Sequence, residues 1–219
     1  MARMRRRAAL VVVCVLALTA AGCSDSKYRY VVNSTENISF RVPRSWTVYS
    51  LPTGAQDRIS PDSPDDVELL WSSGFDADPN PAREHLDAMT DYGRVTVEHP
   101  VGVASVYQIQ GTYNQRVSLT AARTVPLGVD PLFVSDDVRS LVEIIDYQPV
   151  TNFRGLQGTR VVFNLRSTSD SPWSTYDMLT LVDQGRFRMY TFTVGCLGPC
   201  FESSRRQLTE IATSWRFEQ

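Results

Sequence analysis

The chain has few of the residues that common enzyme sites need. It contains only two histidines, His85 and His99, too few for a metal site built from histidine alone. It has no Gly-x-Ser-x-Gly motif, and the nearest string, Trp71-Ser72-Ser73-Gly74, lacks the first glycine. Glycine-rich phosphate loops and dinucleotide fingerprints are also missing from the sequence. The sequence therefore predicts no catalytic residues, no metal site and no cofactor.

Lysine is almost absent, since Lys27 is the one basic residue out of 22 that is not an arginine. Nothing physical requires this ratio, and it indicates codon bias from a GC-rich genome. Residues 23–219 carry 18 basic and 24 acidic side chains. This acidic balance argues against a nucleic-acid partner, which needs a basic patch, and against flat adsorption on anionic lipid head groups.

Long apolar runs are lacking as well. The run from Ala8 to Leu18 has 11 residues, whereas a transmembrane helix needs about 20. Four arginines precede this run and the small residues 19–22 follow it. This order is typical of a secretory signal peptide, so we expect residues 1–22 to be removed. The remaining 197 residues suit one domain.

Cys23 directly follows the expected cleavage point, and the segment resembles a bacterial lipoprotein signal, whose lipobox ends in Gly-Cys. Ala20 occupies the position at which that signal usually has leucine. The resemblance implies cleavage before Cys23 and acylation of this cysteine. We therefore expect a protein anchored by lipid to the extracytoplasmic face of the cell membrane. A polar tether over residues 23–34 would connect the anchor to a domain over residues 35–219.

The other cysteines also fit an exported protein. Cys14 lies in the segment to be removed, which leaves Cys196 and Cys200. A pair of cysteines in an exported domain favours a disulfide that stabilises the fold. A redox-active pair and free thiols are the alternatives, although thioredoxin-like centres have two intervening residues and this pair has three.

Alternating or β-rich runs predict strands, and a tight turn at 183–186 predicts a hairpin between the last two of them. The expected strands are Ile38–Val42, Val67–Ser72, Val95–Val97, Val103–Ile109, Val117–Val125, Thr159–Arg166, Tyr176–Val182 and Phe187–Val194. Apolar stripes with the helical period predict three helices, followed by a short terminal strand at residues 215–217. These helices would cover Ala82–Met89, the segment from the N-cap Ser135 to Ile145, and Leu208–Trp215. The combination predicts a single α+β domain, an antiparallel β-sheet with about three packed α-helices.

Two short motifs then resemble a known fold. Phe40-Arg41-Val42-Pro43-Arg44-Ser45-Trp46 resembles the F-x-V-P-x-x-W opening of the Mog1/PsbP-like fold, and the segment 211–217 resembles its ending. With the lipobox and short tether, the chain is similar to actinobacterial cell-envelope lipoproteins of the LpqN type. This resemblance implies a non-enzymatic envelope role, with binding of lipid or of partner proteins. The segment from Glu98 to Phe133 is longer than the resemblance implies and is interpreted as an insertion.

Two surface features complete the set of candidates. Trp173 follows the polar run 169–172, and an exposed aromatic there would be a contact residue for a ligand or partner. The acidic stretch 57–68 lacks the spacing, glycine and terminal glutamate of an EF-hand, so we interpret it as a solvated loop.

Three functions remain open from the sequence. The first is an envelope lipoprotein that binds an apolar, lipid or glycolipid ligand, or an envelope protein. The second is a structural or assembly subunit without a pocket, and the third is a hydrolase with a site assembled from scattered residues. A large apolar cavity would favour the first function over the second. A polar cleft with a carboxylate or serine of perturbed pKa would favour the third.

Overall fold

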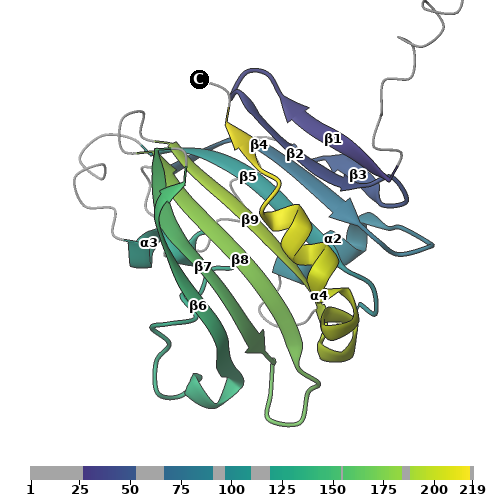
Figure 1. Ribbon diagram of the computed structural model, residues 1–219. Coiled ribbons are helices and arrows are strands. Elements are labelled where there is room, and N and C mark those ends of the chain that lie inside the picture. The colour runs from purple at the N-terminus through teal and green to yellow at the C-terminus, as the bar shows by residue number, and fades with distance from the viewer. Residues whose placement is uncertain are drawn as a thin grey trace, which may run out of the picture.

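The computed structural model describes residues 27–52, 67–90, 97–109, 119–153, 155–183 and 188–217. Within these residues the chain forms two antiparallel sheets flanked by helices (Figure 1). The larger sheet has seven strands in the order β3-β4-β5-β9-β8-β7-β6, and the smaller has three in the order β1-β2-β10. The α+β class with an antiparallel sheet is as expected, and strands outweigh helices.

The elements follow one another along the chain as a series of strands interrupted by short helices. The strands are β1 (Tyr28–Asn33), β2 (Ile38–Pro43), β3 (Thr47–Ser50), β4 (Val67–Asp76), β5 (Val101–Ile109), β6 (Val142–Phe153), β7 (Leu156–Leu165), β8 (Ser174–Asp183), β9 (Arg188–Leu197) and β10 (Arg216–Phe217). The helices are α2 (Arg83–Thr90), α3 (Leu119–Thr124), the 3-10 helix η3 (Arg139–Leu141) and α4 (Gly198–Ala212). In the described part of the chain, no helix has the length and apolar character needed to span a bilayer.

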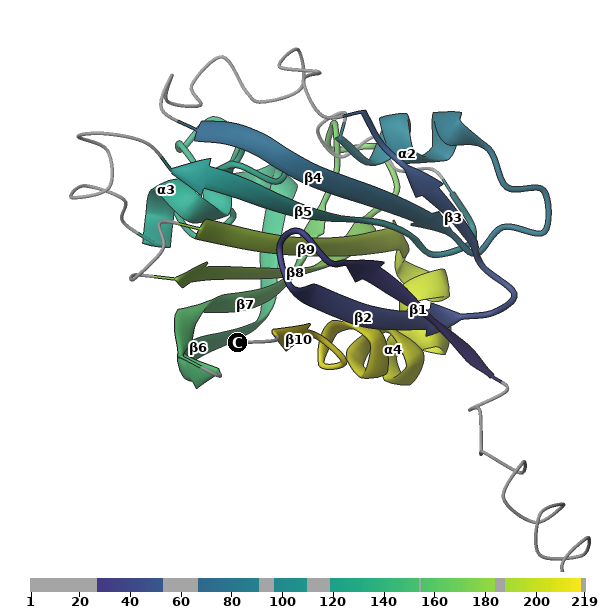
Figure 2. The same cartoon turned by 90° about the horizontal axis from the view of Figure 1, so that it is seen from above.

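The large sheet separates two layers (Figure 2). Helix α4 and the small sheet cover one face, and α2 and α3 cover the other. Strand β9 shows how the sequence builds this arrangement, because residues 190, 192 and 194 enter the core beneath α4 while Thr191 and Thr193 point to the opposite face. The α4 side is the larger core and is rich in aromatic rings, including Phe40, Phe192 and Trp215.

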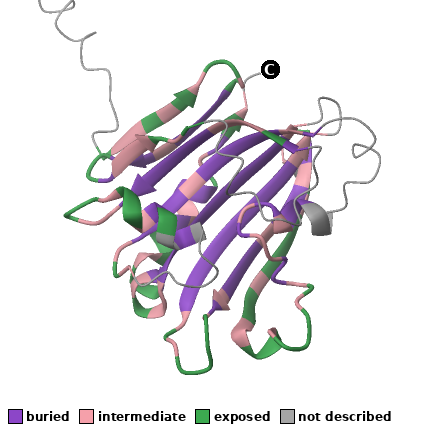
Figure 3. Cartoon of the chain, turned by 180° about the vertical axis from the view of Figure 1, so that it is seen from behind, coloured by how far each residue is buried: buried purple, intermediate pink, exposed green. Residues whose placement is uncertain are grey.

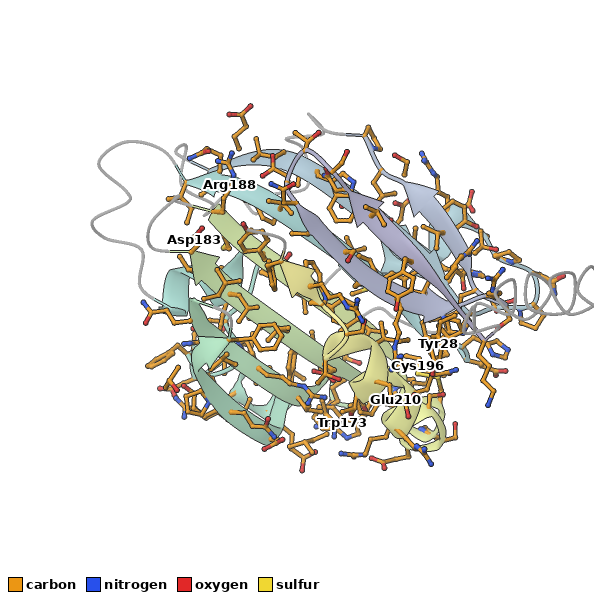
Figure 4. All side chains as sticks on the ribbon, turned by 45° about the horizontal axis from the view of Figure 1, so that its top comes forward. Tyr28, Trp173, Asp183, Arg188, Cys196 and Glu210 are labelled. Atoms are coloured by element: carbon orange, nitrogen blue, oxygen red, sulfur yellow. A yellow bond between two sulfur atoms is a disulfide. The ribbon has the colours of Figure 1, made fainter. Side chains whose placement is uncertain are left out.

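Polar contacts fasten α4 and the small sheet to the large one. Arg160 of β7 forms a two-point ion pair with Asp177 of β8, at 2.8 and 2.5 Å, and also donates to the hydroxyl of Thr209 on α4 at 3.2 Å. The hydroxyl of Tyr28 on β1 donates to Glu210 on α4 at 2.7 Å, and these two side chains point toward one another (Figure 4). These contacts join α4 to β7 in the large sheet and to β1 in the small sheet, although the three elements lie far apart in sequence.

The predicted helix from Ser135 to Ile145 is wrong. The chain forms only the short η3 there and then enters β6, which pairs with β7 along the sheet edge. The segment is rich in β-branched residues, and Pro149 is incompatible with a helix interior but tolerated in an edge strand. Pairing with β7 therefore outweighs the apolar stripe, and a bulge between Ile144 and Asp146 interrupts its register.

The strand predicted from Val117 to Val125 is wrong in the part that the structure describes. Residues 119–124 form α3 instead. Leucine, alanine and arginine dominate this segment, and all three favour a helix. The alternation was too short to outweigh that preference.

Two boundaries also differ from expectation. Residues 28–33, assigned to the tether, form β1 and pair with β2 over their whole length. Tyrosine and valine, which make up four of these six residues, are both favoured in strands. The segment 98–133 is no peripheral insertion, because β5 lies between β4 and β9 inside the large sheet. The strand predicted at Val95–Val97 is not formed at Val97, and its other residues, like the turn residues 184–186, lie outside the described part.

Cys196 and Cys200 form a disulfide that joins the end of β9 to the first turn of α4, with Cα atoms 6.0 Å apart. Cys196 is buried in the main core, and Figure 4 marks its position. The bond fixes where α4 leaves the sheet.

We predict that Cys200→Ser lowers the free energy of unfolding by about 2 kcal/mol, the entropy expected for closing so short a loop. Urea denaturation with and without dithiothreitol measures this effect. The variant should also be insensitive to the reductant. Equal stability of the oxidised and reduced wild-type protein would show that the bond does not stabilise the fold.

Candidate functional site

A cavity of about 280 Å³ lies on the face of the large sheet that α2 covers. Figure 3 views this side of the molecule, where the strands are largely buried. The volume is just below the range of about 300–1,000 Å³ that is usual for small-molecule sites. Protein interiors rarely contain voids larger than a water molecule, so a space of this size is a candidate binding site.

The cavity lies between two apolar clusters. One contains Leu86 and Met89 of α2, and the other contains Ala122 of α3 with Val125. Residues from both clusters reach the cavity and form its walls. The apolar lining comprises Leu51, Pro52, Leu69, Leu86, Met89, Val103, Val125 and Pro126. A ligand with a hydrocarbon part would therefore meet mostly carbon atoms at the sides.

The floor of the cavity is different, because hydroxyl groups form it. Strand register places Ser72, Ser105, Thr191, Thr180 and Thr159 directly opposite one another on β4, β5, β9, β8 and β7. Residues opposed in this way share a face of the sheet. We call these five residues the hydroxyl row. Its first three members line the cavity, together with Tyr107 and Thr193 from the neighbouring rows.

Part of this floor is hydrogen-bonded within itself. The hydroxyl oxygens of Ser72 and Ser105 lie 2.9 Å apart. Tyr107 is hydrogen-bonded with Ser105 and Thr191. Burial raises the pKa of the Tyr107 phenol, and the two hydrogen bonds lower it by less. The phenol therefore stays neutral, and the cavity floor adds no charge of its own from this residue.

Three threonine hydroxyls on the same face have no hydrogen-bond partner among the described residues. They belong to Thr159, Thr180 and Thr193, whose exposed fractions are 1%, 1% and 3%. Thr193 lines the cavity, whereas the other two continue the row toward α3, which packs on β7 and β8. A buried hydroxyl without a hydrogen-bond partner destabilises the folded state, so these side chains lower stability unless a ligand or water bonds to them.

A buried ion pair holds one wall in place. Arg123 of α3 donates through Nε and Nη2 to the two oxygens of Asp130, at 2.9 and 2.8 Å. Asp130 also accepts from the backbone N–H of Leu132 at 3.0 Å. These bonds close the segment 125–132 onto α3, and Val125 and Pro126 of this segment line the cavity.

A second buried carboxylate holds the opposite wall. Asp76, at the end of β4, accepts from the backbone N–H groups of Asp78 and Ala82 and from Nδ1 of His85, at 2.8 to 3.0 Å. His85 lies on α2, so the three bonds tie the start of this helix to the sheet. The aspartate is the one recorded partner of the His85 side chain in the described part. The pair thus acts as an anchor for α2.

The site residues that the sequence predicted and the structure describes, Cys196, Cys200 and Trp173, do not line the cavity. Cys23 and the acidic residues Asp62, Asp65 and Asp66 are outside the described part. Cys196 and Cys200 lie on the α4 side of the sheet, away from the cavity floor. In the described part of the chain, no group of three or more histidine, cysteine and acidic residues could hold a metal ion. The hydroxyl row was not anticipated, although the alternating string Tyr190-Thr191-Phe192-Thr193-Val194 contains part of its signal.

Trp173 lies before β8 and is half-buried (Figure 4). The guanidinium carbon of Arg166 lies 4.2 Å from the centre of its indole ring, so one face of the ring is already in contact. Trp46 and Trp215, in contrast, are buried in the main core. Trp173 does not contribute to the cavity lining, so a contact role for it would involve another surface.

We predict that Trp173→Ala leaves the fold intact and lowers the free energy of unfolding by about 1 kcal/mol, the size of an exposed cation–π contact. Urea denaturation and circular dichroism provide the measurement. A loss of folding would instead identify Trp173 as a core residue.

Comparison with known proteins gives no match to any family model and no match to any curated protein. Among solved structures, the chain is similar to cyanobacterial PsbP (CyanoP) from Synechocystis, with a TM-score of 0.41 and 12% identity over 91% of this chain and 97% of that one. It is similar to the Ran-binding protein Mog1p of Saccharomyces cerevisiae, with a TM-score of 0.45 and 7% identity over 86% and 94%. It is also similar to LpqN, involved in cell envelope biogenesis of Mycobacterium tuberculosis, with a TM-score of 0.40 and 14% identity over 86% and 88%. These neighbours include the proteins that name the predicted fold, and no residue role transfers at such identities.

Proposed function

We propose that this protein is an exported lipoprotein, held at the extracytoplasmic face of the cell membrane by acylated Cys23, whose domain binds an apolar or lipid ligand. The lipobox-like segment that ends at Cys23 supports the anchor. The cavity between the sheet and α2 supports ligand binding, and it is the observation that carries the proposal. A structural subunit without a ligand would have no use for such a space, since close packing stabilises a domain.

The proposed role is non-catalytic. A serine hydrolase needs a serine hydroxyl bonded to a histidine that a carboxylate orients. Ser72 and Ser105 are instead bonded to each other, and His85 is bonded to Asp76 at the start of α2. The described cavity lining contains no histidine or cysteine. The arrangement therefore favours a binding pocket over the hydrolase considered from the sequence.

Native mass spectrometry of the protein extracted from its own membranes tests this function. We expect a mass that exceeds that of the acylated chain by one lipid or lipid-like molecule. Val103→Phe, which places a ring in the cavity, should abolish the added mass while the acylated chain keeps its own. An unliganded wild-type protein in repeated preparations would contradict ligand binding.

Docking of an envelope protein is a second candidate, and the free edge of β6 favours it. Among the described strands β6 pairs with β7 alone, and Ile144, Ile145 and Tyr147 on it are 40%, 40% and 44% exposed. Apolar edge strands are ready to pair with another chain. A photo-crosslinking amino acid at position 147 should capture a partner in intact cells, and the same probe at the exposed Asp170 provides the control. Absence of a cross-link specific to position 147 would remove this candidate.

A further inference from the structure

The hydroxyl row shows which chemical class of ligand the cavity selects, an inference that rests on the proposed ligand-binding function. Packing alone does not require hydroxyls at these positions. Valine has nearly the shape of threonine and would fill the same space without an unbonded oxygen in an apolar interior. Thr193 nevertheless lines the cavity with a hydroxyl that has no hydrogen-bond partner among the described residues, and it is 3% exposed. Thr180 and Thr159 repeat the pattern beside it.

The free hydroxyl of Thr193 can serve a ligand. No hydrogen bond to another described residue fixes its rotamer, and one step about χ1 exchanges the places of the hydroxyl and the methyl group. The hydroxyls that are already hydrogen-bonded can still accept a further hydrogen bond, because each has one hydrogen to donate and two lone pairs that accept. Ser72, Ser105 and Thr191 therefore present further acceptor sites along the same floor.

The charges around the cavity indicate that the bound polar group is neutral. Arg83 and Asp87 are the charged residues of the described lining, and both lie on the exposed side of α2. The guanidinium of Arg83 is bonded to the carbonyl oxygen of Ser50 at 2.9 Å. Arg123 of α3, a buried cation on the same face of the sheet, is already paired with Asp130. A carboxylate or phosphate on the floor would thus be buried without a counter-charge, which is costly.

We propose that the cavity binds a neutral amphiphile that enters with its polar end first, so that a hydroxyl or carbonyl group bonds to Thr193 and the hydroxyl row. Its hydrocarbon part lies against the apolar walls formed by Leu69, Leu86, Met89 and Val125. A charged amphiphile of the same chain length binds more weakly, because its charge would be buried at the floor without a counter-charge. The hydroxyl row therefore acts as the element that determines specificity.

Calorimetric titration with two probes of equal chain length, 1-octanol and octanoate at neutral pH, tests this assignment. Every described strand and helix lies between residues 28 and 217, so a chain without residues 1–23 keeps the whole described fold. We expect this chain to bind 1-octanol at least tenfold more tightly than octanoate. Thr193→Val should weaken 1-octanol binding about threefold to tenfold, the value of one net hydrogen bond.

Thr175→Val is the matched control. Thr175 lies in β8 on the opposite face of the sheet and donates to Asn164 at 2.7 Å. Its loss should lower the melting temperature and leave 1-octanol affinity unchanged. Thr193→Val should leave the melting temperature of the unliganded chain unchanged or raise it, because it removes an unpaired buried oxygen.

Three results would overturn the inference. Tighter binding of octanoate would keep a ligand-binding cavity but reject a neutral ligand. Equal affinity of wild type and Thr193→Val for 1-octanol would mean that the Thr193 hydroxyl bonds to water and not to the ligand. The proposed function itself would be rejected if neither probe bound and if native mass spectrometry gave the same result for Val103→Phe as for the wild type.

Discussion

Asp177→Ala is expected to lower the free energy of unfolding by about 3–5 kcal/mol, because removal of one partner of a buried ion pair leaves the other charge uncompensated. The Asp177 side chain is 1% exposed and that of Arg160 is 16% exposed. The hydrogen bonds to Asp177 raise the pKa of Arg160 in the wild type. The variant loses these bonds, but an arginine still cannot be deprotonated at neutral pH, so the guanidinium charge remains without a partner. The loss should also loosen α4, since Arg160 bonds to Thr209. Urea denaturation followed by circular dichroism measures the change.

Two variants make this prediction specific. Asp136→Ala breaks an ion pair with Arg139 in which the side chains are 96% and 70% exposed, and it should change stability by less than about 0.5 kcal/mol. The double variant Arg160→Met with Asp177→Leu removes both charges and should recover most of the loss. A loss below about 1 kcal/mol for Asp177→Ala would contradict the proposed role of the pair.

The sequence predicted those parts of the fold for which local pattern and final environment agree. β8 and β9 are rich in apolar and β-branched residues, and both occur where expected. α4 likewise follows its apolar stripe through Leu208 and Ile211. β6 was missed because its stripe fits a helix locally, whereas its structure depends on pairing with β7. That pairing is a contact between segments, which a single-sequence pattern does not contain.

The candidate site was harder to predict than the fold. Each member of the hydroxyl row is a common residue in an ordinary strand, and Ser72 was noted in the sequence only as part of the string nearest to a Gly-x-Ser-x-Gly motif. The row exists because five strands pair in one register, and a shift of one residue would turn any member to the other face. The two walls depend similarly on the pairs Arg123–Asp130 and Asp76–His85, which link separate elements. Sequence therefore indicated the strands but not the polar floor that they form together.

The anchor is the part of the proposal for which the largest change is expected. Cys23→Ala should lower the ratio of membrane-bound to soluble protein at least about tenfold, because it removes the residue that would carry the acyl chains of the anchor. The variant is best expressed behind a cleavable secretory signal in place of residues 1–22, so that an uncleaved signal cannot retain it. Intact mass spectrometry of the wild type should show acyl groups on the chain that begins at Cys23.

Cys14→Ala, made in the chain that keeps its own residues 1–22, is the control for the acylated wild type. Cys14 lies in the segment expected to be removed, so its loss should leave both the acyl mass and the membrane fraction unchanged. If Cys23→Ala remains with the membrane after an alkaline wash, the lipid anchor is wrong. The cavity would then still predict a ligand-binding domain, because its walls and floor consist only of residues that come after Cys23. Location and binding are therefore separable, and each is tested by its own residues.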